Sequence, residues 1–218
     1  MRSCPIRQSD YIPRLVDICS HEYIDALIPT IDTDLLLLSQ SKERFEQIGT
    51  RVIICSEERI HTCCDKRLTS AFFEACGLLA PHPVDAVDDY ERGFPCFIKP
   101  LNGSSSINAF KVDTPEELRA YAHTIFDYII QPYIEGTEYT VDIFCDLDGN
   151  PIYITPRERL AVRSGEVLKT RVAQDERIIA ECKRLVTEFR PCGPITVQLI
   201  RQRTTGDDYY IEINPRFG

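Results

Sequence analysis

The end of the chain carries oxygen-bearing side chains at a spacing that suits a metal ion. Its last two apolar segments are typical of the strands of a β-hairpin, over residues 195–201 and 209–214. Because side chains alternate along a strand, Glu212 and Asn214 share one face, and a turn at Thr205-Gly206 would put Gln198 opposite Glu212. A carboxylate and two amide oxygens suit Mg²⁺ that holds a polyphosphate. The alternative is an exposed polar strand face, and the spacing alone favours neither.

A second segment has the chemistry of a phosphate-binding loop. Residues 102–106 read Asn-Gly-Ser-Ser-Ser and follow a strand that ends at Lys99 and Pro100. Glycine and serine leave backbone amides free to point inward and add hydroxyl donors, while Lys99 would supply a positive charge. The sequence has no GxxxxGK[ST] motif, so this is not a Walker loop. The alternative is an ordinary Ser/Gly-rich linker, which is the more frequent meaning of such a turn.

A third segment, residues 131–138, joins two predicted strands through a glycine turn. An adenine ring could hydrogen-bond the backbone near Tyr133, and Glu138 could accept hydrogen bonds from ribose hydroxyls. The alternative is a plain hairpin, and the segment by itself does not exclude it.

The elements that must position these residues alternate between helices and strands. In the first sixty residues, helical periodicity over 10–24 and 34–48 and a buried strand over 51–55 indicate a parallel α/β layer. No strand with a glycine turn precedes them, so we expect the numbering to start inside a domain. The rest of the chain predicts helices over 65–79, from Thr114 to about 127 and over 178–189, and strands over 94–99, 109–112, 128–133, 138–145 and 152–157, before the final hairpin. In that hairpin, strict alternation turns Ile211 and Ile213 away from the face of Glu212.

Composition argues against several classes of protein. The 218 residues carry 25 Lys and Arg against 34 Asp and Glu, a net charge of −9 with no basic block, which argues against a nucleic-acid partner. The longest aliphatic run, residues 35–38, is far shorter than the roughly 20 residues of a membrane helix, and the first twenty residues lack the apolar stretch of a signal peptide. The ten cysteines form no CxxC pair and lie mostly in apolar stretches. They are typical of core thiols, so we expect a cytoplasmic protein.

Taken in order, these segments resemble the ATP-grasp superfamily, most closely stand-alone proteins similar to the ATP-grasp half of the carbamoyl phosphate synthetase large subunit. The resemblance covers about residues 64–218. It rests on Cys64-Asp65-Lys66 at the start of a helix, Phe97-Ile98-Lys99-Pro100, the loop at 102–106, residues 131–142, Gln198, and the ending Glu212-Ile213-Asn214-Pro215-Arg216-Phe217-Gly218.

The resemblance implies an α/β (α+β) ATP-grasp fold preceded by a partial Rossmann-like pre-ATP-grasp domain over residues 1–62. Residues 63–218 would form the ATP-grasp domain, with a small lid subdomain at about 70–132 and a C-terminal subdomain truncated at its end. The chain is then expected to be a fragment of a longer protein.

The resemblance also implies the roles of individual residues. Lys66 and Lys99 would contact the phosphates of ATP, and Ser104, Ser105 and Ser106 would fold over them. The adenine hinge would comprise Gln131, Tyr133 and Ile134, with Glu138 on the ribose. One or two Mg²⁺ or Mn²⁺ ions would be held by Gln198, Glu212 and Asn214. Arg216 and Arg157 would be catalytic, with Arg216 facing the acyl phosphate, and a basic stretch near the triphosphate or the substrate would comprise Arg157, Arg159 and Arg163.

The implied activity is that of an ATP-dependent ligase. Such an enzyme activates a small carboxylate as an acyl phosphate, which an amine or another nucleophile then attacks. Gln198 stands where many relatives have a second carboxylate, so the negative charge that compensates the metal is smaller here. The alternatives are a non-catalytic nucleotide-binding module and an inactive fragment.

Overall fold

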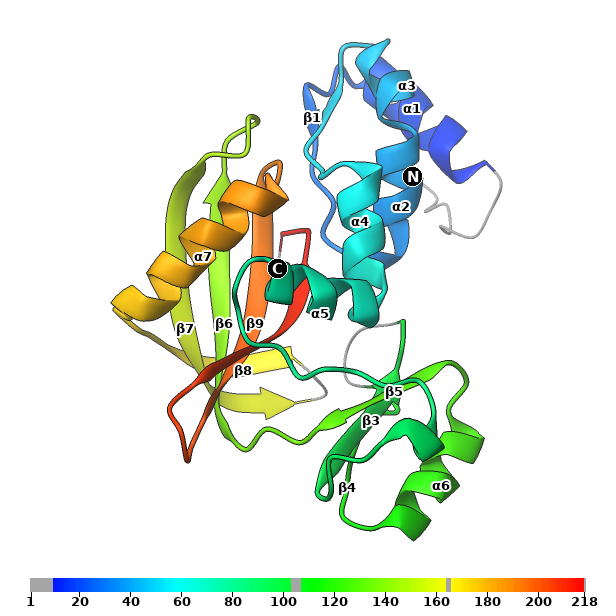
Figure 1. The fold of residues 1–218 in the computed structure, drawn as a ribbon. Coiled ribbons are helices and arrows are strands. Elements are labelled where there is room, and N and C mark those ends of the chain that lie inside the picture. The colour runs from blue at the N-terminus through cyan, green and yellow to red at the C-terminus, as the bar shows by residue number, and fades with distance from the viewer. Residues whose placement is uncertain (1–9, 103–106, 164–165, 218) are drawn as a thin grey trace.

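The computed structural model describes residues 10–102, 107–163 and 166–217. Figure 1 shows three parts: a group of short helices formed by the first residues of this range, a large antiparallel sheet flanked by helices, and a small sheet with one helix. The predicted Ser104, Ser105 and Ser106 lie outside the described residues. No helix among the described residues has both the length and the apolar character needed to cross a membrane.

The N-terminal part is a set of short elements. It contains α1 (Tyr11–His21), β1 (Ala26–Leu27), η1 (Asp32–Asp34), α2 (Leu35–Gln40), α3 (Lys42–Glu46), β2 (Arg51–Val52) and α4 (Glu57–Cys64). β1 and β2 pair in parallel, as the α/β pattern predicts. The single helix predicted over 34–48 is wrong, because Ser41 leaves helical geometry (φ −103°, ψ 6°) and separates α2 from α3. The break lets Phe45 enter the same core as Leu35 and Leu38.

Two further differences concern this part of the chain. The strand predicted over 51–55 is only two residues long, and α4 was not predicted. The signal for α4 is present in the sequence, because Ser56 caps it by accepting a hydrogen bond from the Arg59 amide, and Glu57 and Glu58 occupy the first turn.

The small sheet lies beyond the next helix. α5 (Lys66–Ala75) ends four residues earlier than predicted, and η2 (Val87–Asp89), β3 (Cys96–Pro100), β4 (Phe110–Val112), α6 (Pro115–Thr124) and β5 (Tyr128–Pro132) follow. The sheet order is β4-β3-β5, with antiparallel pairs, and α6 closes a separate core around Ile98, Leu118 and Ile130. Thr114 caps α6 by accepting a hydrogen bond from the Glu117 amide at 3.2 Å, as predicted, whereas the Glu117 side chain accepts the return bond from the Asp113 amide, one residue before the N-cap.

The large sheet contains the second half of the chain. Its strands are β6 (Gly136–Cys145), β7 (Pro151–Arg163), β8 (Glu166–Val172), β9 (Pro194–Gln202) and β10 (Asp208–Asn214), and α7 (Glu176–Phe189) joins β8 to β9. The order is β10-β9-β6-β7-β8, with antiparallel pairs throughout. β8 and the second half of β7 were not predicted. They are rich in charged residues and largely exposed, so they lack the alternation of apolar and polar residues that predicts a strand.

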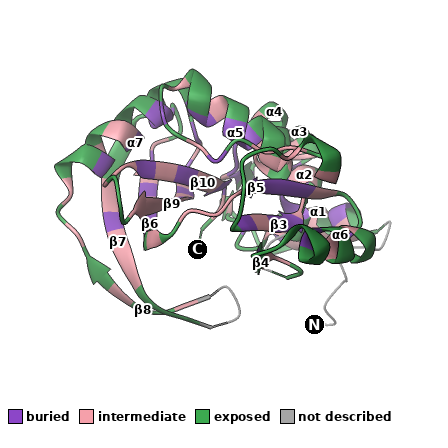
Figure 2. Ribbon diagram, turned by 60° about the horizontal axis from the view of Figure 1, so that its bottom comes forward, coloured by how far each residue is buried: buried purple, intermediate pink, exposed green. Residues whose placement is uncertain are grey.

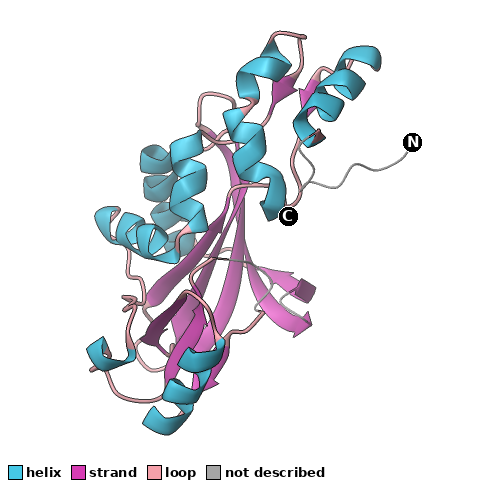
Figure 3. Ribbon diagram, turned by 90° about the vertical axis from the view of Figure 1, so that its right-hand side faces the viewer, coloured by secondary structure: helices cyan, strands magenta, loops and turns pink. Residues whose placement is uncertain are grey.

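Helices and polar side chains occupy opposite faces of the large sheet. Figure 3 shows the helices gathered on one side of it, and Figure 2 shows buried residues on β9 and β10 but mostly exposed ones on β8. On the helix side, the core extends from Phe45 and Ile54 of the N-terminal part through Phe189 of α7 to Val197 of β9. The other face is left with alternating polar residues of β6, β7, β9 and β10, and it carries the candidate site.

Candidate nucleotide and metal site

A cavity of about 290 Å³ lies between the small sheet and the large one. Its wall brings together side chains from β3, from the β5–β6 connection and from the final hairpin: Pro81, Phe97, Lys99, Gln131, Pro132, Tyr133, Ile134, Glu135, Gly136, Glu138, Ile200, Arg203 and Ile211. All five residues predicted between positions 99 and 138 for which the structure describes a side chain are on this wall. The cavity is lined by apolar groups together with Lys99, Arg203 and two glutamates, Glu135 and Glu138, and a largely apolar wall with a few polar groups is expected of a small-molecule site.

Gln131 lies on the cavity wall, but its side chain is engaged elsewhere. Its Nε2 donates a hydrogen bond to the backbone oxygen of Pro81 at 2.6 Å, and the bond is buried. The neighbouring Val84 and Ile130 also exchange backbone hydrogen bonds. Gln131 therefore connects β5 to the segment that follows α5. Within the predicted adenine hinge, the backbone and side chains of residues 132–134 remain available to face the cavity.

The charge of Glu212 acts on two lysines, Lys99 and Lys66. Lys99 is the penultimate residue of β3 and is only 8% exposed, and burial lowers its pKa to about 8, an effect that Glu212 opposes. Lys66 opens α5, which Asp65 caps through the Arg67 amide, and its Nζ donates to the backbone oxygen of Leu101 at 3.1 Å. Burial also lowers the pKa of Lys66, again opposed by Glu212. Two cations held beside one carboxylate form an environment that attracts polyanions.

The final hairpin has the predicted register. Glu212 pairs with Gln198, and Asn214 pairs with Thr196, so the predicted opposition of Gln198 and Glu212 is confirmed. A register shift between Tyr210 and Glu212 interrupts the alternation. The prediction that Ile211 turns away with Ile213 is therefore wrong: Ile211 lines the cavity, whereas Ile213 is buried in the core. The bulge provides an apolar wall beside the oxygen cluster.

The donor set of this hairpin fits a magnesium ion. Mg²⁺ binds hard oxygens and retains water or phosphate in its remaining positions. Glu212 offers a carboxylate, and Gln198 and Asn214 offer amide oxygens. Among the described residues, no three His, Cys, Asp or Glu side chains converge, so this mixed set differs from a zinc-type or all-carboxylate site.

Three of the four predicted arginines, those whose side chains the structure describes, contact an acidic or amide partner. Arg157 forms a two-pronged pair with Asp142, whose Oδ1 accepts from Nη2 at 2.8 Å. Arg216 donates to both oxygens of Asp32, at 2.6 and 2.9 Å. Arg159 bridges Glu138 and Gln198. The backbone of Arg163 ends β7, but its side chain is outside the described part of the structure.

A second cavity, of about 240 Å³, adjoins the oxygen cluster from the other side. It is lined by Asp32, Thr33, Leu35, Cys63, Cys64, Asn102, Glu212, Ile213, Asn214 and Pro215. Glu212 and Asn214 thus face a cavity of their own, whose opposite wall belongs to η1, α2 and α4. Sequence reasoning missed Asp32 and its neighbours, because their approach to residue 216 depends on a contact across 184 positions. It also missed Phe97 and Ile200, although both alternate correctly with core residues in their strands.

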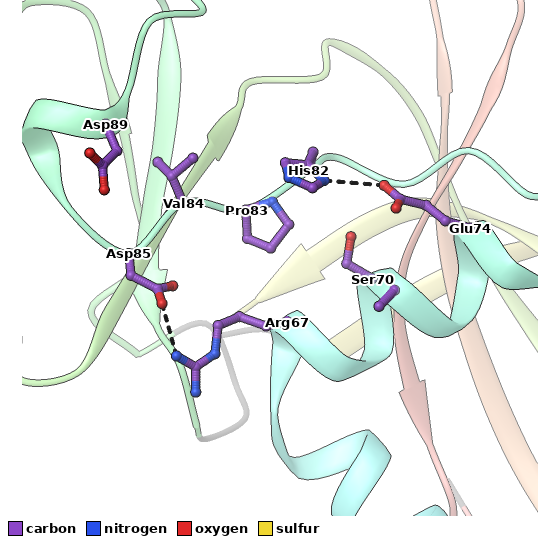
Figure 4. Close-up of a pocket in the computed structure, with 9 residues that line it drawn as sticks. Arg67, Ser70, Glu74, His82, Pro83, Val84, Asp85 and Asp89 are labelled. Atoms are coloured by element: carbon purple, nitrogen blue, oxygen red, sulfur yellow. Dashed lines mark hydrogen bonds and ion pairs between the residues drawn. The ribbon is translucent and has the colours of Figure 1, made fainter.

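A further pocket lies between α5 and the segment at 82–89 (Figure 4). Arg67 donates to Asp85 at 2.9 Å, and His82 Nδ1 lies 3.3 Å from Glu74 Oε1, so an exposed ion pair and an exposed polar contact join α5 to the segment that leads into the small sheet. This pocket shares no lining residue with the two cavities described above. Its contacts hold the segment against α5.

Comparison with known protein families agrees with this geometry. Residues 63–218 match the family described as an ATP-grasp domain, and residues 3–53 match the PylC-like, N-terminal domain family. Among curated proteins, the chain is 26% identical to the D-alanine–D-alanine ligase of Corynebacterium aurimucosum over 168 residues, which is 70% of this chain and 47% of that protein. It is 33% identical to D-alanine–D-alanine ligase B of Clostridium perfringens over 94 residues, covering 38% of this chain and 31% of that protein. The chain thus spans less than half the length of these relatives.

Solved structures share the fold at low sequence identity. Biotin carboxylase from Campylobacter jejuni, in complex with beta-gamma-ATP, superposes with a TM-score of 0.81 at 19% identity, over 97% of this chain and 54% of that one. The L-amino acid ligase from Bacillus licheniformis gives 0.74 at 18% identity, over 97% and 54% of the two chains. The biotin carboxylase domain of Hydrogenobacter thermophilus 2-oxoglutarate carboxylase, in complex with MgADP and bicarbonate, gives 0.80 at 19% identity, over 100% and 54%.

Proposed function

Because this chain belongs to the ATP-grasp family, we propose that it binds Mg²⁺-ATP between its two sheets and uses the nucleotide to activate a small carboxylate for attack by an amine or another nucleophile. The adenine would lie in the larger cavity against residues 132–134, Ile200 and Ile211, with the ribose at Glu138. The triphosphate would extend toward Lys66 and Lys99.

One observation carries the proposal. Glu212 lines the second cavity and also lies beside Lys99 and Lys66, one of which lines the nucleotide cavity. The phosphate-binding charges and the second cavity therefore meet at the metal-ligand cluster. A carboxylate bound in the second cavity would be next to the end of the triphosphate, as a phosphoryl transfer requires.

The chemistry can be written from these positions. A carboxylate oxygen of the substrate bonds to the γ-phosphorus while the bond to the β–γ bridging oxygen breaks, and ADP leaves with the electron pair. The nucleophile then attacks the carbonyl carbon, phosphate leaves, and the amine proton goes to solvent. Lys99 and Lys66 would stabilise the negative charge of the phosphates in a site that burial has largely desolvated. Bound to Gln198, Glu212 and Asn214, Mg²⁺ would neutralise charge on the transferred phosphoryl group.

Several finer assignments are part of this proposal. We propose that the protein resembles carbamoyl phosphate synthetase in particular, that its metal is magnesium, and that it is located in the cytoplasm. We also propose that residues 1–62 and 63–218 form separate domains. Arg216, which follows the metal ligands and is paired with Asp32, would face the acyl phosphate. Arg157 would act only after releasing Asp142.

Isothermal titration calorimetry with ATP and GTP, with and without Mg²⁺, tests the nucleotide site. We expect magnesium-dependent binding that prefers adenine, and equal affinity for GTP would contradict the hinge assignment. Release of ADP and phosphate that depends on an added carboxylate and amine tests the activity.

A non-catalytic nucleotide-binding module is the second candidate. It is favoured by one observation, that both arginines proposed as catalytic are engaged by aspartates, Arg157 by Asp142 and Arg216 by Asp32. ATP binding without turnover across a broad panel of carboxylates and amines would support the module over the ligase.

A further inference from the structure

Arg159 lies between the residue proposed to bind ribose and a residue proposed to bind metal. Its Nη1 donates to Gln198 Oε1 at 3.2 Å and is 3.3 Å from Glu138 Oε2. The three residues come from β7, β9 and β6 and lie on the polar face of the large sheet. The Arg159 side chain is only 9% exposed. A buried cation therefore occupies the groups that a nucleotide and its metal ion would need.

The geometry of the other two arginines is different. Arg157 and Arg216 each donate through two nitrogens to both oxygens of one aspartate, at distances down to 2.6 Å. Two-pronged pairs of this kind are strong and geometrically specific. Arg159 instead uses the same nitrogen for two partners, each at more than 3.1 Å. The contacts of Arg159 with Glu138 and Gln198 are therefore longer and less directional than the paired contacts of Arg157 and Arg216.

The charged side chains around Gln198 and Glu138 determine which ligand the nucleotide-free site attracts. Lys66, Lys99 and Arg159 bring three cations to it, whereas Glu138 and Glu212 bring two carboxylates. A free divalent cation meets repulsion there, and Gln198 Oε1, which it needs as a ligand, already accepts a hydrogen bond from a guanidinium. A nucleotide with its metal ion carries net negative charge and is attracted.

Resting on the proposed function, we propose that Arg159 makes metal binding depend on nucleotide. Without nucleotide, the guanidinium takes the place of a cation between Glu138 and Gln198 and disfavours metal at Gln198, Glu212 and Asn214. When nucleotide binds, ribose takes Glu138 and Arg159 turns to the phosphates, which frees Gln198 Oε1 for the metal. Arg159 is thus a positioning residue that couples the two ligands through one side chain.

Electron paramagnetic resonance of Mn²⁺ measures this coupling without relying on turnover. In the full chain, we expect Mn²⁺ to bind weakly alone and at least tenfold more tightly with ATP. Arg159→Gln removes the cation, so Mn²⁺ alone should bind about tenfold more tightly, while metal-free ATP, titrated in EDTA, should bind about tenfold more weakly. Because coupling is reciprocal, the factor by which ATP strengthens Mn²⁺ binding and the factor by which Mn²⁺ strengthens ATP binding should decrease by the same amount.

Three variants complete the design. Arg159→Lys keeps the charge and should keep Mn²⁺ binding weak in the absence of nucleotide. Arg171→Gln removes an exposed arginine of β8 that pairs with Glu158, and it should change neither affinity. Arg159→Met repeats the test with an apolar stem if Arg159→Gln does not fold, as judged by circular dichroism.

The outcomes separate the inference from the function on which it rests. Unchanged Mn²⁺ affinity in folded Arg159→Gln or Arg159→Met, or the same change in Arg171→Gln, would overturn the role of Arg159. If wild-type protein binds no ATP under any condition, the proposed function fails instead. If it binds ATP but Mn²⁺ binds equally well with and without nucleotide, the function stands and the inference is wrong.

Discussion

Lys99 shows how burial prepares a single side chain for a ligand. It lies near the end of β3 on the wall of the nucleotide cavity, and burial lowers its pKa to about 8 because the ammonium group has lost most of its water. Glu212 opposes the shift without cancelling it. A bound polyphosphate would complete the compensation, so the pKa of Lys99 should rise when ATP binds.

The first prediction concerns protons. Above about pH 8 more than half of the amine is neutral in the free protein, so ATP binding should draw up to one proton per site from the buffer. Calorimetry at pH 8.5 in buffers of different ionisation enthalpy measures this uptake directly. Lys99→Met should abolish most of it, and the exposed Lys111→Met serves as control. Equal uptake in Lys99→Met and wild type would show that another group carries the proton.

The lowered pKa of Lys99 also makes the free energy of unfolding depend on pH. The unfolded chain holds the Lys99 proton up to its ordinary pKa of about 10.4, whereas the folded chain releases it near pH 8. The unfolded state therefore binds more protons in this window. The contribution of Lys99 to the free energy of unfolding should rise as pH increases from about 8 to about 10.

A second prediction at this scale separates Lys99 from Glu212. Lys99→Ala removes a charge that meets phosphate directly and should weaken ATP about tenfold or more even without metal. Glu212→Gln keeps the shape but removes a metal charge, so it should leave metal-free ATP affinity nearly unchanged and reduce the Mg²⁺ enhancement. Titrations with ATP at zero and saturating Mg²⁺ distinguish them. If Glu212→Gln matched wild type in both conditions, the metal site would be wrongly placed.

At the scale of elements, the start of β6 must pass very close to β9. Gly136 lines the nucleotide cavity, and a Cβ built on it would lie 1.9 Å from the backbone oxygen of Arg201. No side chain can move away to make room, because the obstructing atom belongs to the backbone of the paired strand. Glycine at this position is required by the close approach of two strands.

Gly136→Ala should therefore destabilise the fold or displace β6 from β9. We expect the free energy of unfolding to fall by about 1–3 kcal/mol, as for an overpacked site. ATP affinity should fall as well, because residues 132–136 and Glu138 line the cavity. Urea denaturation and ATP titration measure both. Thr137→Ala, an exposed change one residue further along, is the control; a loss as large in Thr137→Ala would argue against a backbone clash.

At the scale of the whole molecule, one ion pair joins the N-terminal part to the candidate site. Asp32 in η1 accepts two hydrogen bonds from Arg216, which follows the metal ligands, and both residues are largely shielded from solvent. Asp32 also lines the second cavity but not the nucleotide cavity. Loss of the Asp32 carboxylate should therefore change the stability of the protein and the second cavity rather than the affinity for ATP.

Asp32→Ala should lower the free energy of unfolding by about 1–3 kcal/mol, because Arg216 loses its charged partner in a half-buried place. ATP affinity should stay within about twofold of wild type. Chemical denaturation and calorimetry give the two quantities. Asp85→Ala, which breaks the exposed pair with Arg67, should cost less than about 1 kcal/mol. A tenfold loss of ATP affinity in Asp32→Ala would show that the two cavities are not independent.

The sequence by itself determined the local features of this protein. The hairpin at the end of the chain, the opposition of Gln198 and Glu212, the capped helix at Thr114 and the strand ending at Lys99 all follow from nearby residues. Alternation, capping and turn chemistry act over a few positions, so they can be read without a fold.

Only the tertiary structure decided which distant groups meet. The outer half of β7 and β8 form strands because each hydrogen-bonds to the other at the edge of the large sheet, although their charged residues lack the pattern of a buried strand. Asp32 reaches Arg216, and Arg159 reaches both Glu138 and Gln198, through packing of strands and helices far apart in the chain. The bulge that brings Ile211 into the cavity depends on how β10 fits β9. Such contacts depend on three-dimensional packing and on burial, neither of which is encoded in the spacing of neighbouring residues.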